Sequence, residues 1–110
     1  MTVEDERKID LVAHRDDDPL VRLVITDHLD WSDELAHLHV LQSKINAYLA
    51  FVESGQFVRE FPQLRSRPVQ IEVAFLYEPT QHACDHFLGR VAELVRDAGL
   101  EFSWRAKERS

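Results

Sequence analysis

The longest periodic pattern in the chain begins after Asp30 and ends at Gly55. Apolar side chains recur there at the 3.6-residue spacing of a helix that buries one face. Asp30 or Ser32 can cap the first turn by accepting backbone N–H groups, and Gly55 supplies the left-handed residue that ends the helix. The stripe predicted to be buried consists of Leu35, Leu38, Leu41, Ile45, Tyr48, Leu49 and Val52.

Four other stretches alternate apolar and polar residues and predict strands. Residues 8–14 and 20–26 are separated by a polar Asp-Pro turn, which favours an antiparallel hairpin. Residues 68–78 form the clearest strand, and residues 100–104 form a short last one. The side chains expected to face the core are Ile9, Leu11, Ala13, Val21, Leu23, Ile25, Val69, Ile71, Val73, Phe75, Tyr77, Leu100, Phe102 and Trp104.

A second helix is predicted between a Thr80 cap and Gly99. Its expected inward side chains are Cys84, Phe87, Leu88, Val91, Leu94, Val95 and Ala98. The connection 56–67 is long for a compact domain and is interpreted as a loop, pinned by Phe57, Phe61 and Leu64. We expect a single domain over residues 1–110, with frayed tails at 1–7 and 106–110.

The element order ββαβαβ predicts an α/β (α+β) two-layer sandwich. Right-handed crossovers place both helices on one face of a four-stranded mixed sheet if the strand order is 1-2-3-4. The open face is then more apolar than a surface in water requires, which suggests a homodimer or partner surface. It would present Val12, Val24, Ala74 and Leu76 among Arg22, Glu72, Ser103 and Arg105.

Charge narrows the classes of partner. The net charge is −7, and residues 1–55 carry twelve acidic against five basic residues, while residues 56–110 carry eight of each. Nucleic-acid binding is disfavoured because it depends on Lys and Arg replacing counterions on phosphates. An acidic surface instead suits a basic protein partner. No apolar run approaches a membrane span, no secretion signal is evident, and the single Cys84 cannot form an internal disulfide, so we expect a cytoplasmic protein.

Candidate chemistry gathers where the second and third strands end. Asp27, His28, Asp30 and Glu78 are expected to meet there if the two strands are parallel, and they could serve acid/base catalysis or hold a divalent cation. Caps and turns explain the same residues without any catalysis. No recognised catalytic spacing or phosphate loop accompanies them, so no catalysis and no cofactor are expected.

Histidine and cysteine give weaker signals. His82 and His86 are four residues apart on the second helix, a spacing that can chelate a metal, but they point away from the apolar stripe and we interpret them as a surface pair. His37 and His39 flank the predicted stripe on opposite sides and cannot act as one ligand pair. Cys84 lies beside the apolar stripe and is interpreted as a small core residue.

Residues suited to binding a partner are spread over several elements. Trp31 precedes the first helix, and Arg59 belongs to the locally basic segment that follows it. Val24 and Leu76 belong to the open sheet face. One edge of the first helix carries His39, Gln42, Asn46 and Glu53, which could recognise a partner or bond to a neighbouring loop.

Three sequence stretches carry a resemblance. They are Asp27-His28-Leu29-x-Trp31, then Lys44-Ile45-Asn46-Ala47-Tyr48-Leu49-x-Phe51-x-Glu53-Ser54-Gly55, and Tyr77-Glu78-Pro79. With these motifs the chain resembles, over nearly its whole length, a family of small bacterial proteins classed as a domain of unknown function. The resemblance implies a small, free-standing bacterial domain and brings no activity with it.

The sequence therefore predicts a protein-binding module, plausibly one that neutralises its partner as an immunity protein does a toxin. The alternative is a small hydrolase or metal-dependent enzyme at the carboxyl ends of the second and third strands. A plainer option is a homodimer through the open sheet face.

Overall fold

Four strands form one mixed sheet in the order β1-β2-β3-β4. They are β1 (Leu11–Arg15), β2 (Asp18–Asp27), β3 (Val69–Tyr77) and β4 (Glu101–Glu108). Strand β1 pairs with β2 antiparallel, and β2, β3 and β4 run parallel. The computed structural model describes residues 11–15, 17–64 and 66–108. The predicted hairpin, strand order and mixed sheet are confirmed.

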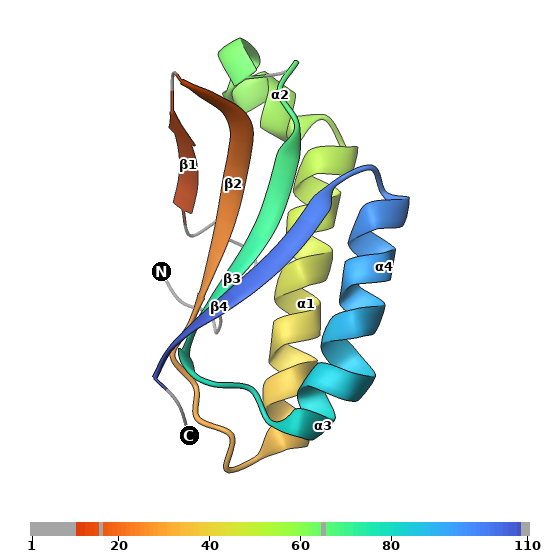
Figure 1. Cartoon of the computed structure of the whole chain (residues 1–110). Helices are drawn as coiled ribbons and strands as arrows, with labels where there is room; N and C mark the ends of the chain where they lie inside the picture. Colours follow the sequence, from red (N-terminus) through yellow and green to blue (C-terminus); the bar gives the residue numbers. More distant parts are fainter. Residues whose placement is uncertain (1–10, 16, 65, 109–110) are drawn as a thin grey trace.

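The helices cover one face of this sheet (Figure 1). Helix α1 (Glu34–Glu53) connects β2 to β3 together with the short α2 (Gln56–Glu60) and the 3₁₀ turn η1 (Pro62–Leu64). A second helical run connects β3 to β4 and consists of α3 (Gln81–Ala83), the π-helical turn η2 (Cys84–Leu88) and α4 (Gly89–Asp97). The predicted two-layer α/β sandwich is thus correct, but the connection 56–67 contains two short helical turns and is not a plain loop. Phe57 and Leu64 are buried within it, as expected.

The core lies between the two layers, where β2 and β3 each present one apolar face to α1 and α4. The alternation in β3 is regular, with every second residue buried from Val69 to Phe75. Tyr77, which was expected to face the core, is exposed because it is the last residue of the strand. Gly55 and Gly99 adopt left-handed backbone angles, φ 86° and 87°, as their predicted places after helix ends require.

Helix α1 buries part of the predicted stripe and part of the face beside it. Leu41, Ile45, Tyr48 and Leu49 are buried as predicted. Leu35 is 77% exposed, while His37 and Lys44 are buried. The buried positions of the helix are His37, Leu41, Lys44, Ile45, Tyr48, Leu49 and Phe51. The N-cap is Asp33, whose side chain accepts the N–H of Ala36 at 3.2 Å, and it is neither Asp30 nor Ser32. Hydrophobicity alone identified four of these positions but missed His37 and Lys44, because both are polar.

Two further predictions, about which side chains of α4 and β1 point into the core, are wrong. Leu94 is 47% exposed, because the buried positions of the second helical run after its π turn are Leu88, Val91 and Val95. In β1, Val12 lies opposite Leu23 and packs against the core, whereas Ala13 lies opposite Arg22 on the open face. The predicted inward set of β1 was therefore one residue out of register, and Ile9 lies outside the described residues.

Strand β4 is longer than predicted. It extends to Glu108 and pairs with β3 along its length, from Gln70 opposite Glu101 to Tyr77 opposite Glu108. Residues 106–108, expected to fray, are therefore part of the sheet. The other predicted tail, residues 1–7, lies outside the described residues.

The open face of the sheet is more polar than expected. Glu72 on β3 forms ion pairs with Arg22 on β2, at 3.8 Å, and with Arg105 on β4, at 2.9 Å. Val24, predicted to be exposed there, is only 5% exposed. A row of paired charges crossing three strands makes this face less suited to an apolar dimer contact than its sequence suggested.

Candidate functional site

The carboxyl ends of β2 and β3 lie side by side, and each strand leads through a short loop to the start of a helix (Figure 1). The loop after β2 runs from His28 to Asp33, and the loop after β3 runs from Glu78 to Thr80. In a sheet with parallel strands, ligands usually bind at this edge. The sequence placed the candidate site here, and the register of β2 and β3 confirms that the two loops meet.

A buried histidine–aspartate pair is the centre of this edge. His37 Nε2 lies 2.5 Å from Asp27 Oδ2, and the two side chains are only 2% and 0% exposed. His37 comes from the first turns of α1 and Asp27 from the last residue of β2. The pair therefore ties the end of the sheet to the beginning of its covering helix.

Both ring nitrogens of His37 and both carboxylate oxygens of Asp27 form hydrogen bonds inside the protein. The carbonyl of Asp30 can only accept, so His37 Nδ1, 2.9 Å away, must carry a proton and donate it. A second proton lies between His37 Nε2 and Asp27, and the other Asp27 oxygen accepts the N–H of Leu29 at 3.0 Å. A histidine with both ring nitrogens bonded has no free nitrogen to act as a general base or as a metal ligand.

Trp31 covers the pair. Its ring stacks on the imidazole of His37, with the centroids 3.8 Å apart and the planes at 27°. Its indole N–H donates to the carbonyl of Tyr77 at 3.2 Å, so the loop after β2 is bonded to the end of β3. The indole also contacts Phe75, at 5.9 Å between centroids. Trp31 thus packs at the start of the helix, as expected, and joins both loops.

The outer side of the loop carries carboxylates. The Asp30 side chain accepts hydrogen bonds from the hydroxyl of Ser32, at 2.6 Å, and from its N–H, at 3.1 Å. The hydroxyl bond, followed by the backbone bond, lowers the pKa of Asp30 below its ordinary value. Asp33 caps α1 and is exposed. Asp30 therefore stays negatively charged at neutral pH, and both side chains face solvent.

A second polar cluster joins the two helix starts. Glu34 accepts hydrogen bonds from the hydroxyl of Thr80 and from His82 Nδ1. The Thr80 bond is the largest cause of a pKa of Glu34 below its ordinary value, and His82 adds to it. Thr80 in turn caps α3 by accepting the N–H of Ala83 at 3.0 Å. This cluster links the first turn of α1 to the start of α3.

The weak metal candidate, His82 with His86, is a contacting pair of rings 4.8 Å apart between centroids. Across residues 11–15, 17–64 and 66–108, no three His, Cys, Asp or Glu side chains come together in a group that could hold a metal ion. Burial raises the pKa of the neighbouring Cys84 thiol above its ordinary value, and the charges of Asp85 and Glu78 raise it further. Such a thiol is a poor nucleophile at neutral pH, which supports its interpretation as a core residue.

Of the four residues of the catalytic alternative, Asp27 and His28 line the same hollow on the open face, whereas Asp30 and Glu78 do not. Asp27 is buried and bonded to His37, Asp30 is exposed and bonded to Ser32, and His28 is exposed. Glu78 is half-buried and acts electrostatically on Cys84. The sequence missed His37, the partner that Asp27 does have.

The predicted binding residues lie in several separate regions. Asn46 and Gln42 line a groove of about 180 Å³ between α1 and the second helical run, opposite His86 and Arg90. Leu76 lines a hollow of about 250 Å³ on the open face, together with Thr26, His28 and Lys107. His39 is exposed on α1. Arg59 belongs to α2, after the far end of α1, and donates to the carbonyl of Ser54 at 3.3 Å.

Charge distinguishes the edge where the two loops meet. We call residues 27–39 and 77–89 the acidic end: they contain four and two acidic residues, no Lys or Arg, and five of the six histidines. The fold and this edge define a small α/β domain with a buried histidine–aspartate pair at its centre. Residues 1–108 match the model of a family of unknown function, DUF6572, and the chain belongs to that family. No curated protein and no solved structure matches the chain. No helix among the described residues has the length and apolar character to cross a membrane.

Proposed function

We propose that this protein is a non-enzymatic binding module that engages a basic protein partner through its acidic end. A bacterial cytoplasmic protein that neutralises or regulates its partner, as an immunity protein does, is the form that we favour. The observation that carries the proposal is the Asp27–His37 pair, which is sealed inside the edge where a catalytic site would be expected. What this edge presents to solvent is carboxylates on a fixed loop.

The fixed loop suits recognition. Asp27 accepts the N–H of Leu29 and His37 donates to the carbonyl of Asp30, and both bonds hold the loop backbone. The Trp31 side chain ties the loop to the carbonyl of Tyr77 at the end of β3. A surface that is already ordered loses little conformational entropy when a partner binds, and this favours affinity. The exposed charges of Asp30 and Asp33 would also attract a basic partner over a distance of about one Debye length, roughly 8–10 Å in physiological salt.

Apolar surface lies beside these charges. Leu35, in the first turn of α1, is 77% exposed. A hollow of about 220 Å³ nearby is lined by Leu29, Ala36 and Val40, with Asp30 and Asp33 also on its wall. A lysine or arginine of the partner fits this combination, because its aliphatic stem packs on apolar surface while its cation pairs with a carboxylate. Apolar contact surrounded by polar groups is the usual anatomy of a protein interface.

The alternative of a hydrolase or metal-dependent enzyme has less support. Its Asp27 carboxylate bonds to His37 and to the Leu29 N–H, and is inaccessible to a substrate. Asp27 and His28 do line one hollow on the open face, but the Asp27 carboxylate is already occupied by these bonds.

Affinity capture from the organism that encodes the chain tests the proposal. The wild type is compared with Asp30→Asn/Asp33→Asn, which removes two charges but keeps both side chains able to accept their present hydrogen bonds. Glu93→Gln/Asp97→Asn on α4 is the matched control, because both side chains are exposed and lie outside the acidic end. We expect the wild type and the control to retain the same basic protein, and the loop variant to lose it. Retention of no protein by the wild type, or equal retention by all three, would contradict the proposal.

A further inference from the structure

The two edges of the sheet differ in how they are protected. Strand β1 has a register shift between Ala13 and Arg15, and such irregularities hinder pairing with another strand. Strand β4, at the opposite edge, keeps one register against β3 from Glu101 to Glu108. It contains no proline, and within the described residues only β3 pairs with it. A regular eight-residue edge of this kind is a template for a further strand.

Side chains on this edge leave apolar surface uncovered. Trp104 points to the helix side of the sheet, where it packs edge-on against Phe75, yet it is 38% exposed. A hollow of about 370 Å³ lies between this part of β4 and the second helical run, and its walls include Leu88, Ala92 and Phe102. A strand added to the edge would place its own helix-side residues next to this hollow.

We propose that the occupant is a second copy of this chain, whose β4 pairs antiparallel with the first β4 around a two-fold axis at Trp104. In this register Glu101 lies opposite Lys107 of the second copy, and Lys107 lies opposite the second Glu101. Ser103 faces Arg105, and Phe102 faces Ala106. Directly opposite residues share one face of an antiparallel sheet, so the two charge pairs lie on the open face and the apolar residues on the helix side.

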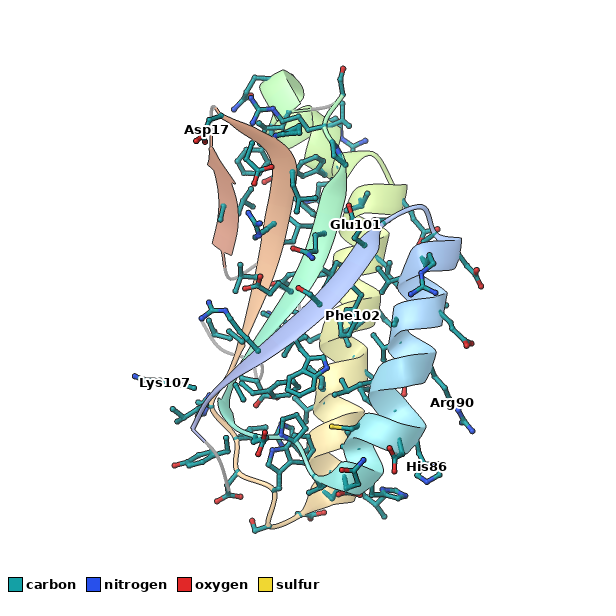
Figure 2. The ribbon with its side chains drawn as sticks, viewed as in Figure 1. Asp17, His86, Arg90, Glu101, Phe102 and Lys107 are labelled. Atoms are coloured by element: carbon teal, nitrogen blue, oxygen red, sulfur yellow. The ribbon has the colours of Figure 1, made fainter. Side chains whose placement is uncertain are left out.

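The charge pattern of β4 selects this register. Figure 2 shows Glu101 near the start of the strand and Lys107 near its end. A pairing centred on Ser103 would leave Lys107 opposite Gly99, before the start of β4, and would place Glu101 opposite Arg105, which already pairs with Glu72. Of these two registers, only the one centred on Trp104 pairs Glu101 with Lys107.

The dimer has consequences for the acidic end. Its two sheets join into one of eight strands, with both helical layers on the same side. Because the two copies of β4 run in opposite directions, the two acidic ends point away from each other. The dimer contact uses neither Asp30 nor Asp33, so self-association and partner binding do not compete.

Charge reversal tests the dimer by sedimentation equilibrium in low salt. Glu101→Lys and Lys107→Glu each convert two attractive pairs into two repulsive ones, and we expect each to raise the dimer dissociation constant roughly tenfold. The double variant Glu101→Lys/Lys107→Glu restores opposite charges and should return the constant close to that of the wild type. Glu53→Lys, an exposed reversal at the end of α1, should leave it unchanged. A wild type that stays monomeric at every concentration, or a double variant no better than the single ones, would overturn the proposal.

Cross-linking tests the register. In a Cys84→Ser background, Trp104→Cys places two thiols directly opposite each other, about 4.5–5.5 Å apart between Cα atoms, which a disulfide spans. Ser103→Cys in the same background places them diagonally, at about 7–8 Å, beyond that range. Oxidation should link the first variant into dimers and leave the second largely monomeric, whereas the reverse result would place the axis elsewhere and refute this register.

Discussion

The imidazole of His37 is clamped between the carboxylate of Asp27 and the carbonyl of Asp30, with its face against Trp31. This one side chain bonds the end of β2 and the following loop to α1. A buried pair of this kind is strongly destabilising to break from one side, because the remaining group is left without its partner in a place that water does not reach.

His37→Ala should therefore lower the free energy of unfolding by about 3–5 kcal/mol in urea denaturation. His39→Ala, two residues further along α1 and exposed, is the control and should change it by about 0.5 kcal/mol or less. Asp27→Asn combined with His37→Ala should cost less than the sum of the two single changes, since both remove the same interaction. Equal effects of the two histidine changes would show that the pair does not stabilise the fold.

Two leucines of α1, Leu35 and Leu41, should differ in how strongly their truncation lowers stability. Leu41→Ala removes a fully buried side chain and should cost about 2–5 kcal/mol of stability. Leu35→Ala should cost about 0.5 kcal/mol or less, because Leu35 is exposed. Leu35→Ala should nevertheless weaken partner binding. Thermal unfolding and binding of the captured partner measure both effects, and a large loss of stability from Leu35→Ala would mean that Leu35 is packed in the core.

The charge of Glu34 should make the free energy of unfolding depend on pH in the acidic range. Its pKa in the folded protein lies below the ordinary value of 4.5, so the folded state favours the charged form. The stability that this provides is present above pH 4.5 and is lost as the pH falls through the lower, folded value. Wild type should therefore be more stable than Glu34→Gln at pH 7, and the difference should shrink as the pH falls below 4.5. Urea midpoints measured between pH 3 and 7 test this, and a difference that grew on acidification would contradict it.

Much of the fold was predictable because its signals are local. Alternation in β2 and β3, the glycines after the helix ends and the right-handed crossovers led to the correct layers and strand order. The exact face of α1 was not predictable from hydrophobicity, since that criterion assigns His37 and Lys44 to solvent. Their positions do fit the buried stripe: residues 37, 41, 44, 48 and 51 are spaced by alternating steps of four and three. This spacing is the signal that could have placed His37 in the interior.

The location of the candidate site was predictable from the sequence, but the hydrogen-bond partners within it were not. Parallel strand ends brought Asp27 and Trp31 to Tyr77 and Thr80, as the topology required. The partner of Asp27 is ten residues away on α1, and no short motif links the two. The turn from β2 into α1 determines which histidine can reach Asp27, and that turn depends on the contacts of Trp31 with both loops. Such tertiary contacts cannot be predicted from the pattern of residues along the sequence.

The salt dependence of the association rate is the sharpest test of whether the basic partner binds at the acidic end. The captured basic partner is mixed with wild type and with Asp30→Asn/Asp33→Asn by stopped flow, at low and at high salt. We expect the wild type to associate fast and its rate to fall steeply with salt, because the carboxylates of the acidic end steer the partner. The variant should associate more slowly, with a rate that depends less on salt. Equal rates for the two proteins at every salt concentration would show that the partner binds elsewhere and that the acidic end is not its docking surface.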